Sequence, residues 1–269
     1  MNELVRTYVV NLRRRPDRRQ HMEATIPDIL RATYTSDWSG PYDGRQLSLE
    51  GLERAGYRLF PWKIESDNPW WGRPLKFGEI ACTLAHLACW QDADGHPEPY
   101  VLILEDDATF AGDFVPRFQN LLEGLEDLPF DLLYLGRFPL EPDQSVKDGV
   151  VSPGYSHCTF GYLLSRPGLD KVLSARLDQA VVPVDEFLPS RSTSTIPEPT
   201  SPTTLAPYPT TESESITGGA SSTSHQSSCG LVHSWTRSPM TVDRSPITVP
   251  SQTKPATRAS SPIVTRSQT

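Results

Sequence analysis

The sequence predicts an α/β fold, a mainly parallel sheet with helices on both faces, followed by a disordered tail. Short β-branched and aromatic runs alternate with segments of helical length over residues 7–188. Strands that alternate with helices favour parallel pairing and helices on both faces of the sheet. The tail, residues 190–269, contains 18 Ser, 16 Thr and 10 Pro, so 44 of its 80 residues are of three types. It has too few large apolar residues to offset its ordering entropy.

The individual elements follow from local patterns. Val, Thr, Tyr and Leu runs predict strands, Pro16 and Pro167 suit the first turns of helices, and the Gly- and Asp-rich segment 36–45 reads as a loop. A largely apolar segment and an amphipathic one predict two further helices. In chain order, the expected strands are 7–12, 27–34, 101–104, 131–136 and 155–164, the expected helices are 16–24, 78–90, 113–125 and 166–175, and residues 181–188 form a short final element.

Composition excludes several classes of protein. The net charge is -8, and because the tail has six basic and four acidic residues, the first 189 residues carry a charge of -10. General nucleic-acid binding draws on a basic surface, so we expect no nucleic-acid partner. The cysteines, at 82, 89, 158 and 229, form no CxxC pair and suggest neither a zinc site nor a disulfide framework.

Targeting signals are also missing from the sequence. The first six residues contain no apolar signal region, and no run approaches the ~20 apolar residues of a membrane span. We therefore expect a cytoplasmic protein without a transmembrane segment. Peripheral contact with the inner face of the membrane is compatible with this expectation.

An acidic cluster is the most informative motif. The apolar run 101–104 is followed directly by Glu105, Asp106 and Asp107. Adjacent carboxylates at the end of a buried strand repel one another unless a cation neutralises them. Hard oxygen ligands suit Mn²⁺ or Mg²⁺, which often bind substrate phosphates as well. The cluster predicts a divalent-metal site for a phosphorylated or nucleotide-bearing substrate, and an acidic turn that caps a following helix is the alternative.

Six separate motifs occur in order along residues 5–189. They are Val9–Arg19, Asp43-Gly44, Gly78–His86, Leu104–Asp107, Gly161–Ser165 and Pro183–Leu188. With these motifs the chain resembles the family 25 glycosyltransferases, which include lipopolysaccharide galactosyl- and glucosyltransferases and the related collagen galactosyltransferases.

The resemblance implies a GT-A type fold and transfer of galactose or glucose from a UDP-sugar to a glycan hydroxyl, as in lipopolysaccharide or cell-surface glycan synthesis. It places Glu105-Asp106-Asp107 where such enzymes carry an Asp-x-Asp metal motif, with Mn²⁺ or Mg²⁺ bridging the donor diphosphate. Asp107 is the strongest candidate for a direct ligand. A metal held by Asp106 and Asp107 would stabilise the negative charge that develops on the departing diphosphate.

Four residues near the start of the chain are candidates for donor binding. Asn11 and Arg13, at the end of the first strand, are placed to contact uracil or ribose, since nucleotides bind at the first βα loop of such sheets. The alternatives are that Asn11 caps a turn and that the Arg-rich run is a solvated helix face. By the resemblance, Asp43 and Gly44 lie in a loop near the donor, and a plain turn explains them equally well.

Glu79 and His86 are the other donor-site candidates. They are seven residues apart, two helical turns, so they share a helix face. Glu79 is a candidate for contacts with sugar hydroxyls, although an acidic residue at a helix start is also explained by the helix dipole. His86 is equally compatible with a structural role in the core.

Asp185 and Glu186 form a second acidic pair and are the candidate catalytic residues. An inverting transferase needs a base within hydrogen-bond reach of the acceptor hydroxyl. Either carboxylate suits that role, or the pair holds sugar or metal. An N-cap of a helix is the alternative for Asp185.

The family-like pattern stops abruptly at Pro189, where the Ser/Thr/Pro-rich segment begins. Residues 1–189 are thus expected to be the catalytic domain, with its last elements missing. A grafted linker or a change of reading frame explains the tail, and the suddenness favours the second. This feature raises an alternative function, a catalytically inactive transferase remnant that acts as a nucleotide-binding or interaction module.

Overall fold

The computed structural model describes residues 3–63, 72–125, 129–147, 150–191 and 206–207. All of them belong to the first of two units, Met1–His233, whereas the second unit, Ser234–Thr269, lies outside the described residues. The predicted tail likewise lies outside them except for residues 190–191 and 206–207.

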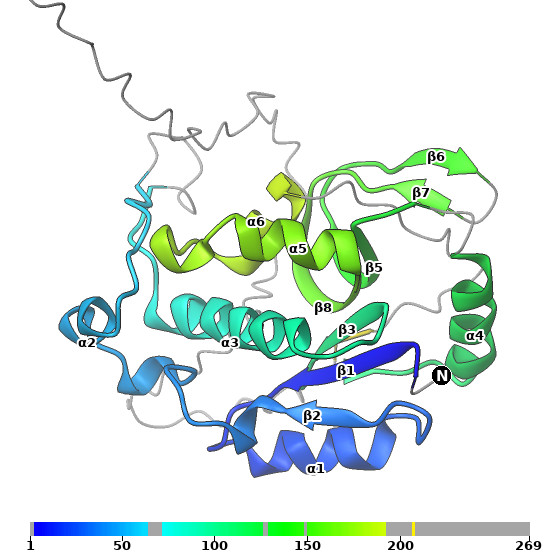
Figure 1. The fold of residues 1–269 in the computed structure, drawn as a ribbon, viewed down its shortest axis with the longest axis horizontal. Coiled ribbons are helices and arrows are strands. Elements are labelled where there is room, and N and C mark those ends of the chain that lie inside the picture. Colours follow the sequence, from blue (N-terminus) through cyan, green and yellow to red (C-terminus); the bar gives the residue numbers. More distant parts are fainter. Residues whose placement is uncertain (1–2, 64–71, 126–128, 148–149, 192–205, 208–269) are drawn as a thin grey trace, which may run out of the picture. The chain divides into compact units, whose positions relative to one another are not determined.

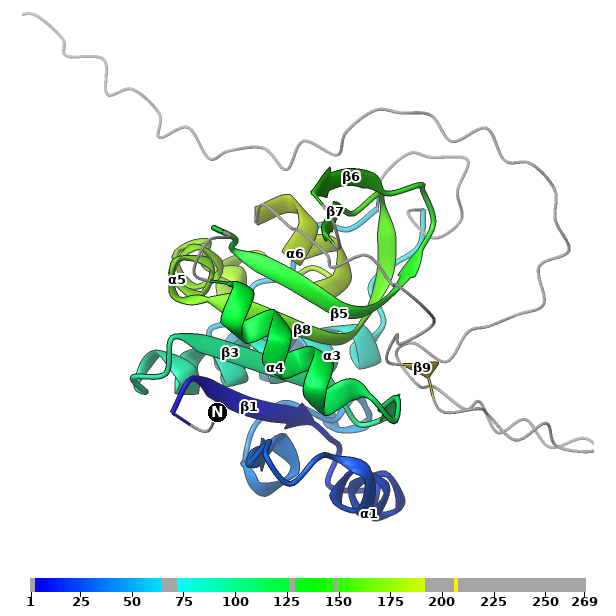
Figure 2. The ribbon, with the colours of Figure 1, turned by 90° about the vertical axis from the view of Figure 1, so that its right-hand side faces the viewer.

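Five strands form the central sheet, in the order β2-β1-β3-β8-β5 (Figures 1 and 2). β1 pairs in parallel with β2 and β3, while β8 pairs antiparallel with β3 and β5. The predicted mainly parallel α/β sheet is therefore confirmed, with β8 as its one reversed strand. The strands are β1 (Val5–Val10), β2 (Ala32–Tyr34), β3 (Tyr100–Glu105), β5 (Leu132–Pro139) and β8 (Ser156–Ser165).

Helices cover both faces of the sheet, as the sequence predicts. One face packs against α2 (Leu49–Arg54), α3 (Phe77–Asp94), α5 (Arg166–Ser174) and α6 (Val184–Arg191). The other packs against α1 (Pro16–Thr25) and α4 (Phe114–Gly124).

Alternation along β3 divides its side chains between these two layers. Val101 and Ile103 belong to the core under α3, whereas Leu102 and Leu104 belong to the core under α1 and α4. Successive side chains of a strand point to opposite faces. Continuing the alternation, Glu105 belongs on the α3 face and Asp106 on the α1 face.

Smaller elements complete the described part. The sequence reasoning did not predict α2 or the short strands, and the predicted strand 27–34 is reduced to its last three residues. β4 follows Asp107 directly and pairs antiparallel with β9. These elements are β4 (Ala108–Thr109), the hairpin β6 (Gln144–Lys147) and β7 (Val150–Ser152), β9 (Ala206–Pro207), and the 3₁₀ turns Thr35–Asp37, Gly44–Gln46 and Leu177–Gln179.

Gly168 allows α5 to begin directly against β5, and its replacement by alanine is expected to destabilise the fold. A Cβ atom at this position would lie 2.0 Å from the carbonyl oxygen of Asp131, a backbone atom that cannot rotate away. Overpacking of this kind costs about 1–3 kcal/mol of unfolding free energy. Urea unfolding of Gly168→Ala measures the loss. Gly78→Ala, in the first turn of α3, is the matched control because its Cβ would meet no atom within 4 Å; equal stability of both variants would contradict the argument.

Candidate active site

Two neighbouring parallel strands, β1 and β3, bring Asn11 and Asp106 together at their carboxyl ends. The Asn11 backbone N–H donates to Thr35 Oγ1 at 2.9 Å, and Thr35 Oγ1 donates to the Asn11 carbonyl at 3.0 Å. These bonds fix the backbone, and the Asn11 side-chain Nδ2 donates to Asp106 Oδ2 at 2.6 Å. Both side chains are buried. The sheet thus assembles part of the predicted site from residues 95 positions apart.

Arg18 of α1 joins Asp106 to Asp107. Its Nη1 lies 2.6 Å from Asp106 Oδ1 and 3.0 Å from Asp107 Oδ2. Burial raises the pKa of Asp107, and the nearby Arg18 opposes this increase. The other oxygen of Asp107, Oδ1, is buried and has no hydrogen-bond partner among the described residues. The carboxylates of Asp106 and Asp107 converge on one positive group, and Asp107 has a further oxygen available for coordination. Such a pair fits a hard divalent cation.

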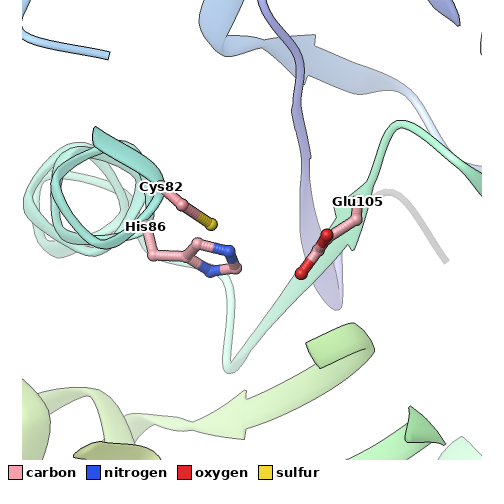
Figure 3. A group of neighbouring side chains, drawn as sticks. All are labelled: Cys82, His86 and Glu105. Carbon is pink, nitrogen blue, oxygen red and sulfur yellow. The ribbon is translucent and has the colours of Figure 1, made fainter. Parts of the chain in front are cut away.

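Glu105 contacts a different part of the molecule, on the α3 face. Its Oε1 accepts a hydrogen bond from Thr159 Oγ1 of β8 at 2.8 Å. Burial, reinforced by the charge of Asp107, raises the pKa of Glu105 to about 8. Possible ligand atoms of Glu105, Cys82 and His86 lie within 4.8 Å of one another (Figure 3). The three residues of the predicted metal site are thus separated in the structure. Asp106 and Asp107 contact Arg18, whereas Glu105 lies beside α3.

His86 lies in the core between α3 and β8. It is completely buried, its ring stacks on that of Tyr162, and its Nδ1 lies 2.8 Å from the Tyr162 hydroxyl. Burial lowers the pKa of His86 to about 3, so the ring is neutral at physiological pH. His86 lies beside Glu105. It does not line the cleft that opens at Asn11.

That cleft has a volume of about 320 Å³ and opens beside the end of β1. The guanidinium group of Arg13, which also lines the cleft, donates hydrogen bonds to the backbone carbonyls of Ser36 at 3.0 Å and Trp38 at 3.1 Å. The Asn11 Oδ1 atom is buried and has no hydrogen-bond partner among the described residues. A buried acceptor of this kind needs a donor from solvent or from a ligand. The lining residues are Asn11, Arg13, Pro16, Arg19, Ser36 and Asp37.

Asp43 and Gly44 form a turn against the N-terminus of α3. Asp43 Oδ1 accepts from the Arg45 backbone at 3.0 Å, and Asp43 Oδ2 accepts from Arg14 at 2.9 Å. A Cβ on Gly44 would lie 2.6 Å from backbone atoms of Phe77 and Gly78, so only glycine fits without displacement. The turn anticipated as the alternative explanation is present. Contact of these residues with a donor stays a prediction.

Glu79 likewise has a structural role at the start of α3. Its Oε2 accepts from the Lys76 backbone N–H at 2.8 Å and from Arg73 Nη1 at 2.9 Å. A second nitrogen of Arg73 binds the other oxygen, so the pair is bidentate. The helix-start explanation of Glu79 is therefore observed, and contact with sugar hydroxyls stays a prediction.

Asp185 and Glu186 lie in the first turn of α6. The Tyr155 hydroxyl donates to Glu186 Oε1 at 2.8 Å, and His157 Nε2 lies 3.0 Å from the Tyr155 oxygen and 3.6 Å from Glu186 Oε1. Burial raises the pKa of Asp185, with His157 opposing it, and burial lowers the pKa of His157. A carboxylate with a raised pKa is suited to accept a proton.

The backbone beside this pair has an unusual conformation. Cys158, in β8, has a φ of 66°, in the left-handed region that residues with a Cβ rarely adopt. The pairing of β5 with β8 is irregular between Tyr134 and Phe138. Strain of this kind often accompanies functional sites. A second hollow, of about 140 Å³, lies next to Tyr155 and is also lined by Tyr134 and Pro189.

The sequence reasoning missed specific roles for Arg18 and Tyr155. Arg18 was treated only as part of a basic run, yet it is in the helix that follows β1 and so lies at the same sheet edge as Asp106. Tyr155 is two residues before His157, and the two side chains hydrogen-bond to each other. Strand alternation could have paired them.

Among the described residues, every helix is too short or too polar to cross a lipid bilayer.

Comparison with known proteins gives consistent matches. The model of "Glycosyltransferase family 25 (LPS biosynthesis protein)" matches residues 5–140. A Bos taurus protein, "Probable inactive glycosyltransferase 25 family member 3", is 35% identical over 188 residues, which are 68% of this chain and 31% of that protein. "Procollagen galactosyltransferase 1" of Danio rerio is 34% identical over 191 residues, 68% of this chain and 30% of that protein. The chain thus spans about a third of the length of these curated relatives.

Proposed function

Because the chain belongs to glycosyltransferase family 25, we propose that it transfers a hexose, galactose or glucose, from a UDP-sugar to a hydroxyl of a glycan. The observation that carries the proposal is a cleft of about 320 Å³ lined by Asn11, whose side chain binds Asp106 and whose buried Oδ1 has no hydrogen-bond partner among the described residues. Asp107 adjoins this cluster through the Arg18 guanidinium that it shares with Asp106. The proposal puts the nucleotide beside the metal-binding pair at the carboxyl ends of parallel strands, and it is supported by the general tendency of α/β sheets to bind ligands there.

In this proposal the cleft binds the nucleoside. Asn11 Oδ1 is an acceptor for the imide N–H of uracil or for a ribose hydroxyl, and the hydrogen bond from Asn11 to Asp106 fixes its orientation. Arg13 and Arg19 line the same cleft, and their guanidinium groups are the candidates for contact with the diphosphate. Arg19 also forms ion pairs with Glu23 and Asp37. Binding satisfies an acceptor that otherwise bears a desolvation penalty of about 1–3 kcal/mol.

Asp106 and Asp107 are the residues that would hold Mn²⁺ or Mg²⁺. Bound there, the cation supplies Lewis-acid stabilisation of the charge on the UDP leaving group. Arg18 forms ion pairs with the same two carboxylates. We propose that Arg18 moves its contacts toward the diphosphate when donor and cation bind, since a guanidinium binds phosphate oxygens as readily as carboxylates.

Asp185 is the proposed base for the acceptor hydroxyl. Its raised pKa increases its basicity. Glu186 is held by Tyr155 and by the nearby His157, and so positions the turn that carries Asp185. As the acceptor oxygen attacks the anomeric carbon, the bond to the diphosphate breaks and the hydroxyl proton passes to Asp185.

The proposed acceptor is a lipopolysaccharide or another cell-surface glycan. The cytoplasmic location of the protein stays a prediction.

One observation favours the alternative, a nucleotide-binding module without catalytic activity. The Arg18 guanidinium lies between Asp106 and Asp107, in the place that a divalent cation would take. Relatives such as the Bos taurus protein also carry the word "inactive" in their names. In this alternative the cleft binds the nucleotide and Arg18 replaces the metal.

Isothermal titration with UDP, with and without Mn²⁺, tests both functions. The transferase proposal predicts that Mn²⁺ strengthens UDP binding and that UDP-galactose or UDP-glucose is consumed in the presence of an acceptor. Binding that is indifferent to Mn²⁺, without consumption of either donor, would instead support the non-catalytic module. The absence of UDP binding to folded protein would contradict both.

A further inference from the structure

We propose that Cys82, His86 and Glu105 form a binding site for a zinc-type divalent cation, chemically different from the hard-cation site proposed at Asp106 and Asp107. The three residues offer a sulfur, a nitrogen and an oxygen ligand within 4.8 Å of one another. Cys82 and His86 are four residues apart on α3, so they lie on one helix face, and Glu105 ends the neighbouring β3. Figure 3 shows the three side chains converging on one space between helix and strand.

The second observation that supports this site concerns the two ring nitrogens of His86. Nδ1 is engaged by the Tyr162 hydroxyl at 2.8 Å, whereas Nε2 is buried and has no hydrogen-bond partner among the described residues. His86 itself is completely buried. A buried polar atom without a partner is unfavourable, because nothing replaces the hydrogen bond that it makes to water in the unfolded chain. A cation coordinated by Nε2 would remove this cost.

The surroundings of the three ligands match the outer shell of a metal site. A metal-bound histidine usually donates its other ring N–H to a fixed acceptor, and Tyr162 is placed to accept it. Trp90 Nε1 donates to the same Tyr162 oxygen at 3.0 Å and holds it in position. Thr159 holds the carboxylate of Glu105 at 2.8 Å. The orientations of His86 and Glu105 are thus set before any ion binds.

The type of ligand indicates the type of cation. Thiolate, imidazole and carboxylate together suit zinc, whereas Mn²⁺ and Mg²⁺ prefer sites built of oxygen. Three protein ligands leave the fourth position of a tetrahedral zinc ion open. The spacing of four between Cys82 and His86 is outside the CxxC pattern, so the sequence alone does not suggest this site.

Cobalt substitution tests the proposal, because Co²⁺ occupies zinc sites and reports thiolate ligation by a charge-transfer band in the near ultraviolet. The full chain, stripped of metal with a chelator, is titrated with Co²⁺. We expect the thiolate band, together with the visible bands of a four-coordinate ion, and we expect one equivalent of Zn²⁺ to abolish both. No thiolate band from folded protein would overturn the proposal.

Two variants assign the band to these residues. Cys82→Ser should lose the thiolate band and bind Co²⁺ on the order of 100-fold more weakly. Cys158→Ser is the matched control, since both thiols are half-buried, and it should keep the band. A band that persists in Cys82→Ser would overturn the assignment. If circular dichroism shows that Cys82→Ser is unfolded, Glu105→Gln replaces it as the test, with Co²⁺ affinity expected to fall at least ~10-fold and unchanged affinity contradicting the site.

Discussion

Replacing Asp107 by asparagine is expected to reduce metal-dependent hexose transfer by about two to three orders of magnitude. Asp107 contributes one of the two carboxylates that converge on Arg18, and its buried Oδ1 has no partner among the described residues. Asparagine keeps the size of the side chain but removes the charge that a divalent cation needs. Arg18 retains its 2.6 Å contact with Asp106, so the fold should be unaffected.

The measurement separates cation binding from nucleotide binding. Titration of Asp107→Asn with UDP should show that Mn²⁺ no longer strengthens binding, while the binding seen without Mn²⁺ stays within a factor of about two of wild type, because Asn11 and the cleft are intact. Asp94→Asn, an exposed change of the same chemistry on α3, is the control and should leave transfer unchanged. Wild-type transfer by Asp107→Asn would remove Asp107 from the metal site.

Replacing Asp185 by asparagine is expected to slow transfer by about 10²–10⁴-fold, the usual contribution of a general base. Burial raises the pKa of Asp185, which makes the carboxylate a better proton acceptor than an exposed aspartate. Asparagine cannot accept the proton. The donor cleft at the end of β1 does not include Asp185, so affinity for UDP should change less than about twofold.

Single-turnover kinetics with a saturating donor, combined with UDP titration, distinguish this role from a structural one. A structural role would lower UDP affinity and thermal stability along with the rate. Asp113→Asn, an exposed change beside α4, is the control. If Asp185→Asn transfers at the wild-type rate, Asp185 is not the base; if it loses UDP binding as well, its role is structural.

Much of the fold could be predicted because its elements carry strong local patterns. The apolar run that forms β3 and the amphipathic α4 lie within two residues of their predicted bounds. The direction of β8 could not be predicted, since its pattern of buried residues is the same for either orientation. The helix α2 was missed because it has only six residues, most of them exposed, and Leu52 is its only buried residue.

The site could be predicted only in part for a similar reason. The place of Asn11 at the end of the first strand and the acidic cluster that contains Asp106 made both residues candidates, and the order of the strands brings Asn11 Nδ2 to 2.6 Å from Asp106 Oδ2. Sequence reasoning treated Glu105, Asp106 and Asp107 as one metal set, although strand alternation sends Glu105 toward Thr159 of β8 and Asp106 toward Arg18. Contacts between distant segments, such as Glu186 with Tyr155, depend on packing that no local pattern encodes.

The position of β8 has a consequence for how the protein reaches its native state. β8 lies between β3 and β5 and is the only strand that joins them, although it is the last of the five to be synthesised. Until residue 165 has left the ribosome, β2-β1-β3 and β5 have no shared partner, and β3 presents an open edge. Hydrogen exchange during refolding should therefore show protection of β5 appearing no earlier than that of β8, because β8 pairs directly with β3 whereas β5 joins the sheet only through β8.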